Sequence, residues 1–197
     1  RDGGDYAAGA RRPGGFQFAE DTVVLPLHTG THVDALCHCW YDDKLYNGFS
    51  GDGVRSSGAQ LLGVHTMPPV VARGLLLDFV ALTGAPLADG TPIDPQILQA
   101  ALARTGTDLT PGDVVLLRTG WHEAQGQTAP DYNAEPGLDL DAALVLAEAG
   151  VAMVGADNFA VEVLPFAPGT VFPVHQRLIR DFGIPLLEGL VLQPLAE

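Results

Sequence analysis

The chain has 197 residues, of which 47% are hydrophobic and 17% charged, so it has enough apolar material to form one folded domain. Its formal net charge of −14 argues against nucleic acid or an anionic membrane surface as the main partner. The two cysteines, Cys37 and Cys39, make a poor structural disulfide at this spacing and favour a reducing compartment, which we predict to be the cytoplasm.

The first 22 residues are predicted to form a mobile arm or loop, because residues 1–15 are rich in glycine, alanine and arginine. The remainder, 23–197, is predicted to be a single domain, since it has no linker and no internal repeat. The apolar run Val23–Leu27 predicts a short strand that leads to His28. Many glycines and serines over 47–63 predict a loop.

Strands and helices are predicted to alternate from residue 70 onward. Continuous apolar runs indicate buried strands, and the helices are marked by capping residues, by proline at the first position or by a closing glycine. The predicted strands are 75–80, 114–117, 151–155 and 184–187, and the predicted helices are 94–104, 140–149 and 173–181. This alternation favours an α/β or mixed α+β fold.

Metal-binding residue types are concentrated between His28 and His38. Three of the six histidines fall within these eleven residues, and Asp34 lies two positions after His32. Histidine nitrogen and carboxylate oxygen are ligands that zinc and manganese accept. Thr29–Thr31 is poor helix-forming sequence, so we expect a tight turn around a metal. His28, His32 and Asp34 are therefore predicted ligands, the alternative being ordinary hydrogen-bonded residues.

His38 is the predicted acid–base residue, although it could also be a further ligand. Histidine has an ordinary pKa of ~6.5, which suits proton transfer beside an activated water. Cys37 and Cys39 flank it and could join a zinc cluster, but without a second cysteine pair we favour small buried apolar roles. Four aromatic residues are predicted to form the walls of a substrate pocket, the alternative being that they pack in the core. They are Trp40, Tyr46, Phe49 and Trp121.

Two residues near the C-terminus extend the candidate set. His175 falls on the predicted helix 173–181, and Glu188 ends the strand that follows; spacing alone also allows both to be surface residues. Asp157 ends a buried strand, where it is either a functional residue or the cap of a turn. His65 and His122 are interpreted as structural or surface residues.

The stretch from His28 to His38 resembles the HxGTHxDxPxH signature of the cyclase and bacterial kynurenine formamidase superfamily, which includes isatin hydrolase. Segments 115–121 and 154–157 are also similar to that family, as are His175 and Glu188. The resemblance therefore covers most of the chain from about residue 23.

Three features depart from the family pattern. Leu36 stands where the signature has proline, and Asp157–Phe159 replaces the Asp-Thr/Ser pairing of formamidases. The opening strand of the family is absent here. The segments 40–42 and 45–48 resemble a less characterised branch of the superfamily.

The resemblance implies a swivelling β/β/α fold with a central mixed sheet flanked by helices, assembled as a homodimer or homotetramer. It also implies one or two zinc or manganese ions per chain, the first held by the three ligands predicted above. His38 would be the catalytic acid–base. His175 and Glu188 would bind a second metal, with Asp34 bridging, or contact the substrate in a one-metal enzyme.

The expected activity is hydrolysis of a small amide, cyclic amide or lactone by a metal-activated water. One alternative is a metal-dependent cyclase or dehydratase of a small metabolite, and another is a non-catalytic metal-binding protein. Structural zinc sites are normally closed by four protein ligands that commonly include cysteine. The first cluster offers three strong ligands and an acid–base group, which favours an enzyme.

Overall fold

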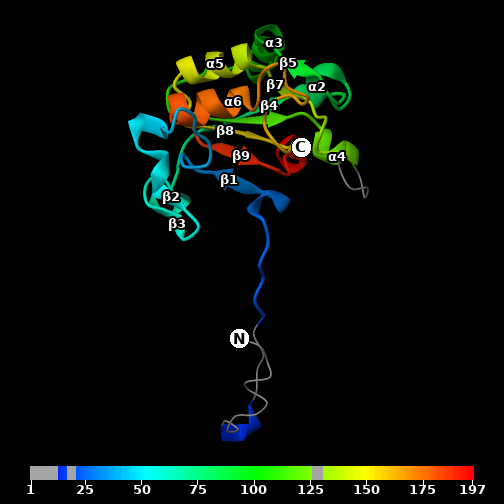
Figure 1. Cartoon of the computed structure of the whole chain (residues 1–197). Helices are drawn as coiled ribbons and strands as arrows, with labels where there is room; N and C mark the ends of the chain where they lie inside the picture. The colour runs from blue at the N-terminus through cyan, green and yellow to red at the C-terminus, as the bar shows by residue number, and fades with distance from the viewer. Residues whose placement is uncertain (1–12, 17–20, 126–130) are drawn as a thin grey trace.

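A five-stranded sheet lies at the centre of the protein (Figure 1). The computed structural model describes residues 13–16, 21–125 and 131–197, so most of the arm predicted over 1–22 lies outside the described residues. The strands of this sheet are β1 (His32–Asp34), β4 (Gly74–Asp78), β6 (Val114–Arg118), β8 (Met153–Ala156) and β9 (Leu186–Glu188). Their spatial order is β1-β9-β8-β6-β4, in which β1 is antiparallel to β9 and every other pair is parallel.

Two small sheets accompany the central one. The first is the hairpin of β2 (Val54–Arg55) and β3 (Gly58–Ala59), and the second pairs β5 (Pro92–Ile93) with β7 (Gly137–Leu138) in parallel. The segment 47–63, which was predicted to be a loop, is largely irregular, but it also contains this short hairpin.

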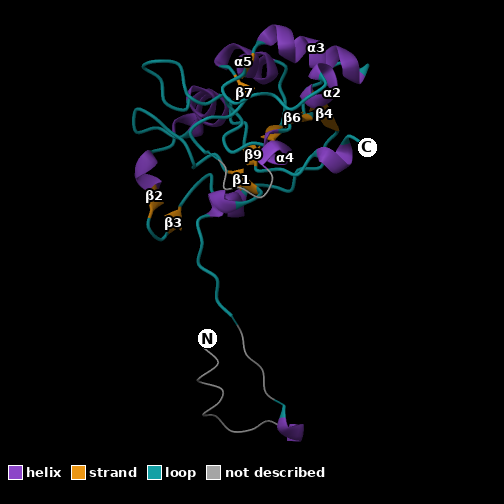
Figure 2. Cartoon of the chain, turned by 90° about the vertical axis from the view of Figure 1, so that its right-hand side faces the viewer, coloured by secondary structure: helices purple, strands orange, loops and turns teal. Residues whose placement is uncertain are grey.

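Helices lie over one face of the central sheet (Figure 1). They are α2 (Phe79–Thr83), α3 (Pro95–Thr105), α5 (Leu140–Glu148) and α6 (Pro173–His175), the last continued by a π-helical segment, Gln176–Asp181. The short helix α4 (Trp121–Gln125) follows β6 at the side of the sheet. Short 3₁₀ helices occupy Pro13–Gly15, Leu27–Thr29, Tyr46–Gly48, Gly51–Gly53, Val64–Thr66 and Gln193–Leu195. Figures 1 and 2 both place α3 and α5 on the side of the sheet opposite residues 21–26. Within the described ranges, no helix is both long enough and apolar enough to cross a membrane.

The core lies between these helices and the sheet. Alternate residues of β4 and β6 point into it, as shown by the buried Leu75, Leu77, Val115 and Leu117. Leu116 lies on the opposite face and is only half-buried. This alternation follows from the two-residue period of a strand, and it confirms the predicted class of a mixed α/β protein with a central mixed sheet.

Capping residues fix the ends of the predicted helices. Asp94 accepts hydrogen bonds from the backbone N–H groups of Gln96 and Ile97, at 2.9 and 2.8 Å, and Gly106 follows α3 with a φ of 67°. A residue in this left-handed region is usually glycine, which has no side chain to clash. The observed helix therefore agrees with the predicted one to within about a residue at each end.

Strand ends are less well predicted than helix ends. The predicted strand 75–80 stops at Asp78, because the Asp78 carboxylate accepts the Ala81 N–H at 2.9 Å and opens α2. The strands predicted at 151–155 and 184–187 are observed at 153–156 and 186–188. Pairing between neighbouring strands decides these limits, and a single apolar run does not contain that information.

The strand predicted over Val23–Leu27 is wrong. Residues 21–26 have no regular structure and leave the body of the protein as an extended segment (Figure 1). Val23 and Val24 are 75% and 94% exposed. Apolar β-branched residues form a strand only where a neighbouring strand accepts their hydrogen bonds. His28 is carried instead by the 3₁₀ helix Leu27–Thr29.

A buried carboxylate joins the loop before β6 to the segment before β4. Asp113 accepts hydrogen bonds from Arg73 Nε and Nη2, at 2.9 and 2.6 Å, and from the Thr110 backbone N–H at 2.7 Å. The Arg73 guanidinium is the main reason that the pKa of Asp113 is lowered to about 2.

The free energy of unfolding is expected to fall as the pH is lowered from about 4 to about 2, because the unfolded chain protonates Asp113 before the folded chain does. Asp113→Asn should remove this contribution, so the free energy of unfolding of the variant should depend less on pH over the same interval. Urea unfolding followed by circular dichroism at several pH values measures the difference. Identical pH dependence in both proteins would contradict the assigned role of the Asp113 charge.

Candidate metal centre

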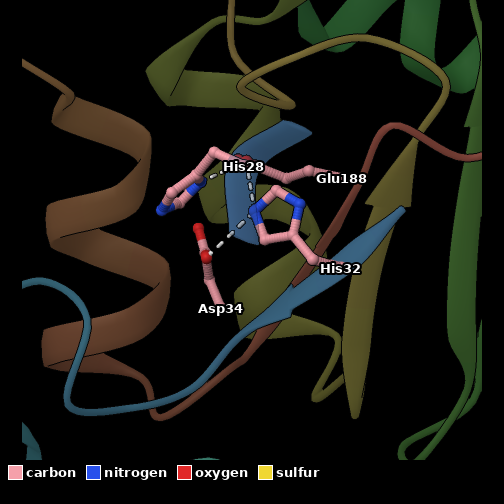
Figure 3. Close-up of side chains that lie close together, drawn as sticks. All are labelled: His28, His32, Asp34 and Glu188. Carbon is pink, nitrogen blue, oxygen red and sulfur yellow. Dashed lines mark ion pairs between the residues drawn. The ribbon is translucent and has the colours of Figure 1, made fainter. Parts of the chain in front are cut away.

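The edge strand β1 and its neighbour β9 bring three predicted ligands together (Figure 3). In the antiparallel pair of β1 and β9, His32 stands directly opposite Glu188. Asp34 is two residues further along β1, so its side chain projects from the same face of the sheet. His28 approaches this group from the 3₁₀ helix that precedes β1.

The side chains of this first cluster converge on a small volume. His32 Nε2 lies 3.2 Å from Glu188 Oε2 and 3.4 Å from Asp34 Oδ1. His28 Nδ1 lies 3.7 Å from Glu188 Oε2. One ligand atom from each of the four residues falls within 4.8 Å of all the others, which is the spacing that a shared metal ion requires.

A second cluster adjoins the first through Asp34. One ligand atom each from Asp34, His38 and His175 also lies within 4.8 Å of the others. Asp34 Oδ2 is 3.5 Å from His38 Nε2 and 3.6 Å from His175 Nε2, and Glu188 Oε1 is 3.2 Å from His175 Nε2. The structure thus brings all six predicted metal and acid–base residues into one place.

Several polar atoms of these clusters are buried without a hydrogen-bond partner among the described residues. They are His32 Nε2, Asp34 Oδ2 and Glu188 Oε1. The Nδ1 atom of His32 lies 2.8 Å from the Gly30 carbonyl oxygen, so it carries the proton and Nε2 presents a lone pair. Lone pairs that face one another in a dry site cost about 1–3 kcal/mol per unsatisfied group. Divalent cations held by the two clusters would satisfy these atoms, so these residues fit a metal.

Charge in the site is shared between carboxylates and imidazoles. Burial alone would raise the pKa of Asp34, but His175, His38 and His28 lower it below its usual value. Burial opposes the charged form of His175, yet the carboxylates of Asp34, Glu162 and Glu188 raise its pKa well above 6.5. A positive charge held among three carboxylates indicates that this place favours cations.

An aromatic hollow adjoins the first cluster. His28 and His32 line one side of it, and Trp121, Tyr132 and Phe159 line another. The ring centroids of Tyr132 and Phe159 are 4.9 Å apart, and those of Trp121 and Tyr132 are 6.4 Å apart. These walls suit a flat apolar group beside the cluster.

Trp40 lies on the other side of the site. It lines a hollow with His38, Phe172 and His175, and also a groove that reaches the β2–β3 hairpin. Tyr46 instead lies against Gly183. Neither Tyr46 nor Phe49 lines any of the three hollows at the clusters, so the structure brings only two of the four predicted aromatic residues to them.

Asp157, the two cysteines and His65 belong to neither ligand cluster. Asp157 ties two strand ends together, since its carboxylate accepts the Thr119 hydroxyl at 2.6 Å and the Gly120 N–H at 2.7 Å. Cys37 and Cys39 are free thiols of intermediate burial. His65 is exposed and outside both clusters, as expected.

Sequence reasoning missed residues that have no motif spacing. Tyr132 and Phe159 come from separate loops, and His122, interpreted as structural, lines the aromatic hollow. Glu162 makes a buried contact with His175 Nδ1 at 2.6 Å. A carboxylate thirteen residues before a candidate ligand is the only signal for Glu162, and it is too common to be informative.

Comparison with known proteins identifies the family. A model of the Cyclase family matches residues 7–163. A crystal structure described as a novel cyclase shares 36% identity with a TM-score of 0.83, and the match covers 100% of this chain and 67% of that one. The chain therefore belongs to the Cyclase family. A search of curated proteins found no significant match.

Isatin hydrolases have the same fold. One, bound to the product analogue thioisatinate, is 24% identical with a TM-score of 0.63, and the match covers 95% of this chain and 68% of that one. Isatin hydrolase A from Labrenzia aggregata, bound to benzyl benzoate, is 21% identical with a TM-score of 0.66, covering 95% and 69%. The family and the six-residue cluster together make this protein an enzyme with a candidate metal site, whose metal and substrate are addressed below.

His32→Ala and Asp34→Ala are each expected to lower the metal content per chain, because each substitution removes a converging ligand atom. Inductively coupled plasma mass spectrometry on untagged protein measures the metal, and circular dichroism checks the fold. His65→Ala removes a histidine outside both clusters and is the matched control. Full metal content in the His32 and Asp34 variants would refute the assignment of these ligands.

Proposed function

We propose that this protein is a metal-dependent hydrolase of a small amide, cyclic amide or lactone. The observation that carries the proposal is the convergence of unsatisfied acceptor atoms of His32, Asp34 and Glu188 beside the partly exposed His38. A structural metal site would be closed by its ligands. Here the His38 side chain is 38% exposed and borders an open groove, which supports a catalytic role.

The proposed ligands divide between two metal positions. His28, His32 and Asp34 would hold the first ion. His175 and Glu188 would hold a second, with Asp34 bridging, or would contact the substrate in a one-metal enzyme. Glu188 also belongs to the first cluster, because its Oε2 atom faces His32 while its Oε1 atom faces His175. Imidazole nitrogen and carboxylate oxygen suit both zinc and manganese, so the donor set supports either metal.

A bound divalent ion supplies Lewis-acid activation of water and of the scissile carbonyl. His38 acts as the acid–base: its imidazole takes a proton from the attacking water and returns it to the leaving nitrogen or oxygen. Burial lowers the pKa of His38 below its usual value, although the Asp34 carboxylate opposes this. The basic form of His38 is therefore present at neutral pH, as a general base requires.

The hollows on the two sides of the site support a small substrate with a flat apolar group. Trp121, with Tyr132 and Phe159, would hold such a group beside His28 and His32. Trp40 would contact the part of the substrate nearest to His38.

A cyclase or dehydratase reaction is the second candidate, supported by the family to which the chain belongs. An activated carbonyl serves ring closure or loss of water as well as hydrolysis. Turnover in ¹⁸O-labelled water separates the two, because hydrolysis places the label in the product. Unlabelled product would favour the second candidate.

His38→Ala is expected to keep its metal and lose turnover by roughly 10²- to 10⁴-fold, the usual contribution of a general acid–base. A panel of cyclic amides, lactones and formamides supplies the substrate, and metal content is measured on the same samples. His65→Ala again serves as the control. Loss of metal in His38→Ala would make His38 a ligand, and near-normal turnover would rule out its acid–base role.

We also propose that the protein is a homodimer or homotetramer in a reducing compartment. Val24 and Val71 are 94% and 97% exposed, and Val23 and Leu25 are 75% and 53% exposed. Full burial of an exposed valine or leucine side chain in a contact between chains stabilises association by about 1.5–3 kcal/mol. A second copy of the chain is the proposed cover. The two free thiols at Cys37 and Cys39 support the compartment.

Val24→Asp is expected to weaken this assembly, since it places a charge in the proposed contact. Light scattering coupled to size-exclusion chromatography should give a multiple of the monomer mass for the wild type and a lower mass for the variant. Val171→Asp, at a position that is 64% exposed near α6, is the control. A monomeric wild type would contradict the proposal.

A further inference from the structure

Glu162 is a buried carboxylate that points at a candidate metal ligand. It lies between β8 and α6 and is only 1% exposed. Its Oε1 atom is 2.6 Å from His175 Nδ1 and accepts the His175 backbone N–H at 3.1 Å. Its Oε2 atom accepts the Val174 backbone N–H at 3.1 Å. Both oxygens are therefore used at the start of α6.

The position of Glu162 is fixed by β7, independently of His175. The Leu138 N–H donates to the Val161 carbonyl, and the Val163 N–H donates to the Leu138 carbonyl, both at 3.0 Å. Gly137 allows this close approach, because a Cβ at that position would collide with the Glu162 backbone. The backbone at Glu162 is thus held in place by contacts that do not involve His175.

The contact decides which nitrogen of His175 is available. A carboxylate at 2.6 Å from Nδ1 requires a proton on that nitrogen. The other nitrogen, Nε2, lies 3.2 Å from Glu188 Oε1 and 3.6 Å from Asp34 Oδ2, and it would give up its proton to present a lone pair to a metal. We propose that Glu162 is a positioning residue that fixes the tautomer and orientation of His175, so that Nε2 is aimed at the metal. This inference rests on the metal site of the proposed function.

His32 shows the same arrangement with a different partner. Its Nδ1 is bonded to the backbone carbonyl of Gly30, and its Nε2 faces the cluster. A carboxylate adds negative charge that a carbonyl lacks, and so increases the basicity of the ligand. Glu162 therefore strengthens His175 as a donor as well as orienting it.

Glu162→Gln is expected to weaken Zn²⁺ binding by roughly 10- to 100-fold, the usual effect of removing such a partner. The glutamine oxygen can still accept one bond, but its amide group cannot accept the second backbone N–H. Competition with a chromophoric chelator measures the affinity of the full chain. Glu162→Asp keeps the charge and should lose less affinity, which also covers the case in which Glu162→Gln does not fold.

Glu135→Gln is the matched control. Glu135 is fully buried, and its carboxylate accepts the Phe159 and Ala160 N–H groups, both at 2.8 Å. It belongs to neither ligand cluster. Burial raises the pKa of Glu135 to about 8, so Glu135→Gln removes little charge at neutral pH. It makes the same chemical replacement at a similar depth, and we expect Zn²⁺ affinity close to that of the wild type. Equal losses of affinity in Glu135→Gln and Glu162→Gln would reduce Glu162 to a structural role and overturn the proposal.

The metal-free protein gives a second readout. In ¹⁵N-edited NMR spectra, the His175 Nδ1 proton should be protected from exchange with water in the wild type and in Glu135→Gln. It should exchange faster in Glu162→Gln, where a neutral acceptor replaces a charged one. An unprotected proton in the wild type would overturn the proposal. A different result would count against the proposed function instead: a wild type whose His175 Nδ1 proton is protected but which does not bind Zn²⁺.

Discussion

The antiparallel pairing of β1 with β9 is the constraint on which the site depends. It joins the first strand of the central sheet to the last, and its register places His32 opposite Glu188. Residues 156 positions apart in the chain thereby supply neighbouring ligand atoms. A shift of one residue in this register would turn Asp34 and His32 to the opposite face of the sheet. The candidate centre therefore requires β1 and β9 to pair in this register.

Buried carboxylates organise the protein around this centre. Asp157 joins the ends of β6 and β8, Glu135 holds the Phe159–Ala160 backbone, and Glu162 holds the start of α6. Each accepts at least two hydrogen bonds, which offsets the cost of burying a carboxylate. Asp34 and Glu188 differ, because each leaves one oxygen unsatisfied within the described part of the chain. That contrast separates carboxylates that build the fold from those available to a cation.

Much of the fold could be predicted because its signals are local. The helix from Pro95 begins where the Asp94 side chain caps it, and the apolar run at 114–117 forms β6. The run Val23–Leu27 has the composition of a strand, but no strand among residues 13–16, 21–125 and 131–197 pairs with it, so it does not form one. Local composition specifies which side chains prefer an extended backbone, whereas pairing depends on segments distant in sequence.

The sequence by itself predicted the first group of candidate ligands, since spacing within one strand and one turn places His28, His32 and Asp34 near each other. It also indicated the family through that motif. The spacing of His175 and Glu188 did not place them at the same site, and only the resemblance to the family implied it. The tertiary structure alone assembled Tyr132 and Phe159 into an aromatic wall. The physical reason is separation along the chain. Short-range geometry follows from the backbone period, whereas contacts between distant segments are set by sheet order, register and packing.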